Sequence, residues 1–88
     1  MLNAKIIQAI RREAVQRAAQ VRVERMLERY EFNYLDHEGV WVRPGFDLKF
    51  MVAGASWIGF YAADSSEEPT YSGAGMKELL LVLEEVCG

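Results

Sequence analysis

The chain has 88 residues, of which 51% are hydrophobic and 26% are charged, with a net charge of -3. That composition excludes a disordered chain, and no apolar run approaches the roughly 18 residues that a transmembrane helix needs. We expect one small domain over residues 1–88. A domain of this size buries only about 60–65% of its unfolded surface, so association with a partner would add usefully to its stability.

Cys87 is the single cysteine and cannot form an internal disulfide, which excludes a disulfide-stapled secreted scaffold and favours the reducing cytoplasm. The first residues lack the apolar stretch and cleavage site of a secretory signal, so we expect no cleaved leader.

The charge is unevenly distributed along the chain. Residues 1–30 carry seven basic and three acidic side chains, 7 − 3 = +4, and the remainder carries 3 − 10 = −7. The sequence therefore predicts an electrically polarised molecule.

Residues 3–30 contain neither proline nor glycine and are rich in good helix formers, which predicts one long basic helix over residues 1–30. At about 1.5 Å per residue this helix would span about 40 Å, whereas a domain of this length is about 30 Å across. Part of the helix must extend beyond the domain, or the helix must bend.

The apolar stripe of this helix changes side along its length. At 100° per residue, one side collects Ile6, Ile7, Ile10, Ala14 and Val21. The opposite side collects Val15, Ala19, Val23, Met26, Leu27 and Tyr30. Three explanations remain open: a kink, a break into two helices, or an N-terminal half that packs against a partner, most simply a second copy. Arg11, Arg22, Arg25 and Arg29 form a basic edge, which we expect to be a solvated face.

Alternating patterns and turn residues after Tyr30 predict an antiparallel meander of four strands, at 31–36, 40–43, 46–52 and 56–62, within a sheet region of residues 31–63. Residues 76–86 form a leucine-rich second helix, and residues 64–75 form an acidic loop with Asp64, Glu67 and Glu68. The fold class is therefore α+β, in the order αββββα, with both helices on one sheet face.

The turn positions predict a strand register. Centring the third turn on Gly54 sets Val52 opposite Ser56, and centring the second on Pro44 sets Val42 opposite Phe46. The first turn sets Leu35 opposite Val40. One face, the expected core, then collects Phe46, Leu48, Phe50, Ile58 and Phe60. The other face collects Phe32, Tyr34, Trp41, Arg43, Asp47, Lys49, Met51, Trp57 and Tyr61.

The second face is too aromatic to be left in water, so either a helix of the same chain or another molecule covers it. The inventory of aromatic residues, methionine and arginine is typical of an interface core. The residues that we predict to bind a partner are Trp41, Arg43, Lys49, Met51, Trp57, Tyr61, Ile6, Ile7 and Ile10.

The sequence offers little for catalysis. One histidine and one cysteine cannot form a zinc site, and His37 sits on a predicted turn where neighbouring side chains point apart. Gly73-Ala74-Gly75 before a helix weakly suggests anion binding, with Lys77 as the nearby base, but lacks the Walker lysine and serine. We predict no catalytic residue, no metal and no cofactor.

The order helix, strands, helix, with Gly73 to Lys77 opening the last helix, resembles the topology of double-stranded RNA-binding domains. That family presents a lysine cluster at the start of its final helix, whereas here Lys77 is followed by Glu78 and a leucine run. The function is therefore not carried over.

Two functions remain as hypotheses. The first is a small non-catalytic protein-interaction module, self-associating as a homodimer or acting as a stoichiometric inhibitor or immunity-type protein, in the manner of phage anti-CRISPR proteins, through an acidic surface. The alternative is a nucleic-acid-binding domain that stacks bases on the sheet aromatics and holds phosphates with the first-helix arginines. The net charge of -3 favours the first.

Overall fold

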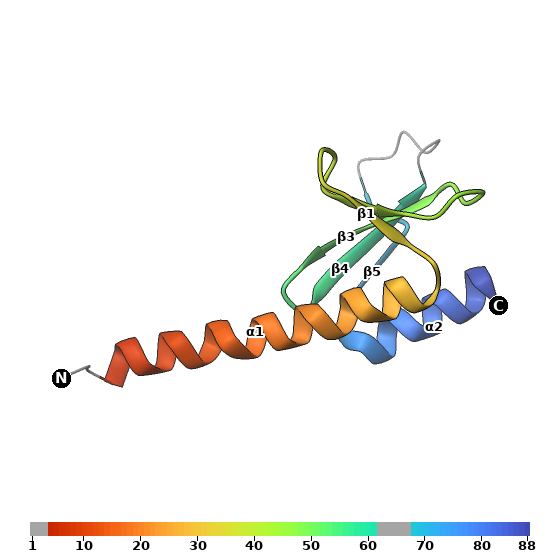
Figure 1. Cartoon of the computed structure of the whole chain (residues 1–88). Helices are drawn as coiled ribbons and strands as arrows, with labels where there is room; N and C mark the ends of the chain where they lie inside the picture. Colours follow the sequence, from red (N-terminus) through yellow and green to blue (C-terminus); the bar gives the residue numbers. More distant parts are fainter. Residues whose placement is uncertain (1–3, 62–67) are drawn as a thin grey trace.

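The computed structural model describes residues 4–61 and 68–88 (Figure 1). The elements are α1 (Ala4–Arg29), β1 (Asn33–Leu35), β2 (Val40–Val42), β3 (Leu48–Ala53), β4 (Ser56–Tyr61), β5 (Tyr71–Ala74) and α2 (Gly75–Cys87). The strands form one antiparallel sheet in the order β1-β2-β3-β4-β5, and both helices pack on the same face of it. The predicted α+β class and the placement of the helices are confirmed.

Helix α1 is continuous, so the change of side in its apolar stripe reflects neither a break nor a second helix. Its C-terminal half lies against the sheet and α2, where Val23 and Leu27 are fully buried. Its N-terminal half extends beyond the other elements, and the molecule as a whole measures 53 × 25 × 21 Å (Figure 1). The expected extension beyond the domain is confirmed.

Helix α1 ends in a Schellman motif without glycine. The Phe32 N–H donates to the Leu27 carbonyl at 3.0 Å and the Glu31 N–H donates to the Glu28 carbonyl at 2.9 Å. Glu31 occupies the left-handed position with φ 69°, where glycine is the usual residue. The motif turns the chain so that Phe32 enters the core beneath the sheet.

The strand register differs from the prediction at two of three turns. Leu35 pairs with Val40 as expected. Ala53 pairs with Ser56, however, so β3 and β4 are joined by the two-residue loop Gly54-Ala55. Gly54 has φ 59°, which suits the first position of a tight hairpin turn. The pairing is shifted by one residue, which turns every β4 side chain to the opposite face.

The β2–β3 connection is longer than expected. The Phe46 N–H donates to the Arg43 carbonyl at 3.1 Å, which closes a turn over Pro44 and Gly45, and β3 begins only at Leu48. Trp41 consequently pairs with Phe50. This shift of three residues also reverses the faces, now for β2.

The two shifts place both indoles under the helices. Trp41 is 5% exposed and Trp57 is 2% exposed, so the expectation that these rings point away from the core is wrong. Ile58 and Phe60, expected in the core, lie on the opposite face because β4 is reversed. The buried cluster contains Val23, Met26, Leu27, Phe32, Trp41, Leu48, Phe50, Trp57, Leu79 and Leu83.

Two glycines make room for the large rings. A Cβ at Gly59 would lie 2.9 Å from Cε1 of Phe50, and a Cβ at Gly73 would lie 2.7 Å from Cζ2 of Trp57. Both distances are shorter than carbon atoms tolerate, so each ring lies over the backbone of a neighbouring strand.

The chain contains a fifth strand, β5, where the acidic loop was expected to continue to residue 75. It pairs with β4, with Trp57 opposite Gly73. Asp64 and Glu67 lie outside the described residues, and Glu68 is exposed. Helix α2 follows β5 directly and buries Leu79 and Leu83 against the sheet.

Candidate functional site

The N-terminal half of α1 is the largest part of the described chain that the rest of the molecule, which we call the body, leaves uncovered. We call residues 4–18 the projecting half, because every residue from 11 to 18 is exposed. Val15 is 68% exposed, although it lies on the same side of the helix as Val23, which is 0% exposed two turns later. The body-facing side of α1 thus continues beyond the point that the body reaches.

A second apolar stripe lies on the other side of this helix. Ala14 and Val21 are exposed there, about 160° around the helix from the buried Val23. Ile6, Ile7 and Ile10 belong to the same stripe by their spacing and lie in the N-terminal turns of α1, and their side chains are outside what the structure describes. The predicted partner-binding isoleucines are therefore on the projecting half.

The projecting half is basic. It carries Lys5, Arg11, Arg12 and Arg17 against Glu13, 4 − 1 = +3, which leaves −3 − 3 = −6 for the rest of the chain. Arg17 and Glu13 form an exposed ion pair at 2.9 Å along one helix face. Most of the positive charge that the sequence analysis counted over residues 1–30, +3 of +4, thus lies on the projecting half.

The second uncovered surface is the sheet face opposite the helices. The open sheet face consists of Val42, Met51, Ile58 and Phe60, with Lys49 among them, whereas Val40 on the same side is buried. Met51 is paired with Ile58 and is 43% exposed, and Ile58 and Phe60 are half-buried. Monomeric proteins rarely expose a contiguous apolar face of this kind.

A hollow of about 220 Å³ opens at one end of this face, beside Met51 and Ile58. Toward the β1–β2 turn the face becomes polar, because Nζ of Lys49 lies 3.7 Å from a carboxylate oxygen of Glu38. The predicted partner-binding residues Lys49 and Met51 therefore do lie away from the core, and their companions are aliphatic rather than indole rings.

The aromatic residues predicted to bind a partner serve the interior instead. Trp57 donates its Nε1–H to the Gly75 carbonyl at 3.1 Å, which ties β4 to the start of α2. Tyr61 packs against the core. The hydrogen bond between the side chains of Tyr71 and Tyr61, together with burial, raises the pKa of Tyr71 above its usual value.

Arg43 is also engaged within its own chain. Its guanidinium donates to the Tyr30 carbonyl at 3.1 Å, pairs with Glu31 at 3.3 Å and lies 4.3 Å from the centre of the Phe46 ring. A cation at the C-terminal end of a helix is stabilised by the helix dipole. Arg43 therefore caps α1 rather than presenting a free charge.

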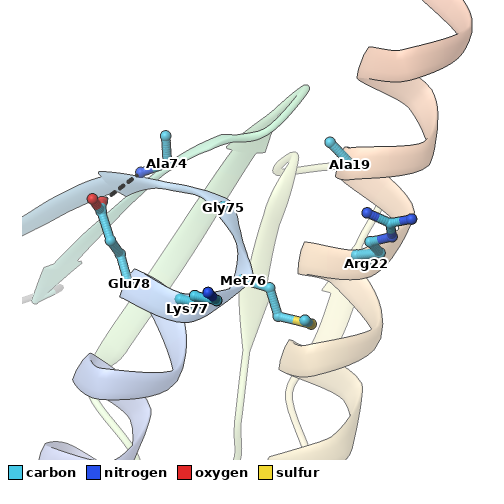
Figure 2. Close-up of a pocket in the computed structure, with 7 residues that line it drawn as sticks. All are labelled: Ala19, Arg22, Ala74, Gly75, Met76, Lys77 and Glu78. Atoms are coloured by element: carbon cyan, nitrogen blue, oxygen red, sulfur yellow. Dashed lines mark hydrogen bonds between the residues drawn. The ribbon is translucent and has the colours of Figure 1, made fainter.

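A shallow hollow of about 490 Å³ lies between α1 and the start of α2 (Figure 2). Arg22 and Lys77 line it, but so does Glu78, whose carboxylate accepts the Ala74 N–H at 2.8 Å. The Gly75 N–H donates to the Ala55 carbonyl at 2.8 Å. The Ala74 and Gly75 amides are therefore bonded within the chain, and Glu78 adds a negative charge to the hollow, which weakens the anion site suggested by the sequence.

Within residues 4–61 and 68–88, no group of three or more His, Cys, Asp or Glu side chains lies close enough to hold a metal ion. His37 is exposed on the β1–β2 turn. Over the same described ranges, no helix is both long and apolar enough to cross a membrane.

Comparison with known proteins gives no relative for this chain: it matches no protein-family model, no curated protein and no solved structure. The two uncovered surfaces are the features of the molecule that bear on its function.

Sequence reasoning placed Val42, Ile58 and Phe60 in the core, whereas they are half-buried on the open sheet face. The signal that could have found them is Gly59. A glycine inside a strand marks a close approach of another group, which places it on the packed side and its neighbours on the open side.

Proposed function

We propose that this chain is a non-catalytic protein-interaction module whose docking element is the projecting half of α1. The observation that carries the proposal is that α1 continues as one helix to Ala4 while residues 11–18 are all exposed. Isolated helices of this length are marginal in water, and most helical stability in proteins comes from packing an apolar face. A partner on the projecting half would supply that packing.

The surface composition supports the same proposal. The projecting half offers an outward apolar stripe that includes Ala14 and is flanked by arginines. Arginine is enriched at protein interfaces, where its long stem packs and its head stays hydrated. Self-association is the simplest version of the proposal, because a second copy is always present.

The inhibitor or immunity-type version, of the anti-CRISPR kind, requires an acidic surface that occludes a basic partner. It draws on the charge of −6 outside the projecting half, and it includes Asp64 and Glu67, which lie outside the described residues. The cytoplasm is the compartment we propose, on the ground of the single cysteine.

The nucleic-acid alternative loses its specific contacts. It needs Trp41 and Trp57 to stack on bases, and both are buried. It also needs Arg43 and Lys49 to hold phosphates, and these two are paired with Glu31 and Glu38. Only the basic edge of α1 would remain for a polyanion.

The test compares two charge-matched variants of α1. Ala14→Asp with Val21→Asp places carboxylates on the outward stripe, whereas Gln8→Asp with Gln16→Asp makes the same charge change on the opposite side. Affinity capture from the native host and light scattering then measure bound protein, with far-ultraviolet circular dichroism as the check on folding. We expect the wild-type chain and the Gln8/Gln16 variant to hold a stoichiometric protein partner, either another copy or a host protein.

We expect the Ala14/Val21 variant to lose that partner while keeping its fold, because a desolvated carboxylate inside an interface is costly. Retention of the partner by this variant contradicts the proposal. Absence of any protein partner, together with salt-sensitive binding of labelled oligonucleotides, would favour the alternative.

A further inference from the structure

We propose that the open sheet face is the seat for the projecting half of α1 from a second copy, so that two copies exchange helices in a two-fold dimer. This inference rests on the proposed function, because it takes the projecting half as a docking element and names what it docks on. It adds to the proposed function the surface on which the projecting half docks, which is the open sheet face. It also names the partner, which is a second copy of this chain.

Both surfaces carry apolar side chains that the described residues leave exposed. Met51 is exposed on the open sheet face, beside a hollow of about 220 Å³ that it lines together with Ile58. Val15 and Ala14 are exposed on the helix. An aliphatic side chain on a helix is the kind of group that a shallow apolar hollow accepts, and placing one surface on the other removes both from water.

Charge decides between this arrangement and a contact between two helices. Two projecting halves placed side by side would bring +3 against +3. A projecting half placed on the body of the other copy brings +3 against −6. Because like charges across an interface are costly and opposite charges are favourable, the helix-on-sheet arrangement is preferred.

Two of the acidic groups, Asp36 and Glu38, lie at the end of the sheet from which α1 projects. β1 and β3 run in the same direction, so the β1–β2 turn with Asp36 and Glu38 lies at the same end as the β3–β4 hairpin. The Gly54 N–H of that hairpin donates to Oε1 of Gln20 at 3.1 Å, which fixes α1 to this end. The projecting half leaves the body at the β3–β4 hairpin end of the sheet. A two-fold axis next to this end therefore places the projecting half of each copy over the open sheet face of the other copy.

The dimensions agree. The projecting half is about 22 Å long at about 1.5 Å per residue. The face of a five-stranded sheet is about 19 Å wide at about 4.8 Å between strands. A standard interface buries about 1,600 Å² in total, so each of two identical contacts needs to bury about 800 Å².

The test is disulfide trapping between two single-cysteine chains in a Cys87→Ala background. One chain carries Ala14→Cys on the helix and the other carries Met51→Cys on the sheet, and they are mixed and oxidised in a glutathione buffer. We expect the mixed 14–51 product to exceed both homodimeric products, and its yield to fall as salt rises. A parallel pair of variants, Met51→Asp and the matched control Leu81→Asp on α2, measures the dimer by light scattering.

We expect Met51→Asp to weaken the dimer at least tenfold with an unchanged far-ultraviolet circular dichroism spectrum, and Leu81→Asp, at a more exposed apolar position, to leave it intact. A dominant 14–14 product would show helix-to-helix association, which overturns this inference and leaves the proposed function standing. A dominant 51–51 product, or a monomer at every concentration, also overturns it. If the chain is monomeric, the proposed function is tested separately by affinity capture of a host protein, which compares the wild-type chain with the Ala14/Val21 variant.

Discussion

Glu31 is the residue at which backbone conformation and sequence disagree. Its φ of 69° lies in the left-handed region, which costs a residue with a Cβ about 1 kcal/mol or more. The surrounding hydrogen bonds impose this conformation, since Phe32 must turn into the core directly after α1. The Arg43 guanidinium holds the same segment, because it forms an ion pair with the Glu31 carboxylate and donates a hydrogen bond to the Tyr30 carbonyl.

We predict that Glu31→Gly is more stable than Glu31→Ala by about 1 kcal/mol. Both variants lose the carboxylate that pairs with Arg43, so their difference isolates the backbone conformation. Urea unfolding of the two proteins measures it. Equal stabilities would mean that residue 31 does not adopt the left-handed conformation in solution.

At the scale of the elements, the helices were predictable from sequence and the sheet register was not. Helix α1 follows from an unbroken run of helix formers, and α2 from its leucines, because propensity and periodicity act locally. The register depends on loop length to a single residue. The loop Gly54-Ala55 has two residues where three were assumed, and that difference sends Trp57 to the core and Ile58 to the surface.

The fifth strand escaped prediction for a related reason. β5 contains Ser72, Gly73 and Ala74, which have low intrinsic preference for strands. It forms because pairing with β4 and the close approach of the Trp57 ring to Gly73 decide the conformation. Tertiary contacts of this kind cannot be read from local composition.

The observed register makes a prediction for Gly59. The fully buried Phe50 ring occupies the space that a Cβ on residue 59 would need. Gly59→Ala should therefore lower the free energy of unfolding by about 1–3 kcal/mol. Ser72→Ala, on the open side of the same sheet, is the control and should change stability by about 0.5 kcal/mol or less. Thermal unfolding compares the two. A neutral Gly59→Ala would favour the register first expected, in which residue 59 faces away from the core.

For the whole molecule, the sequence predicts that a domain of this size has more apolar surface than it can cover. That prediction assigned the uncovered surface to the wrong residues. The indoles of Trp41 and Trp57 were expected outside and are buried. The excess is aliphatic instead, on the open sheet face and on the projecting half. The extension of α1 was predictable from helix length against domain diameter, because both follow from residue count.

The account's central claim is that the projecting half of α1 is covered by protein when the chain functions. Amide hydrogen exchange of the full chain, followed by mass spectrometry on peptides from α1 across a range of protein concentrations, tests it most directly. We predict that amides of residues 8–18 exchange quickly in dilute solution and become protected as concentration rises, approaching the protection of residues 19–29. Rapid exchange of residues 8–18 at every concentration, and equally with host extract present, would contradict the claim.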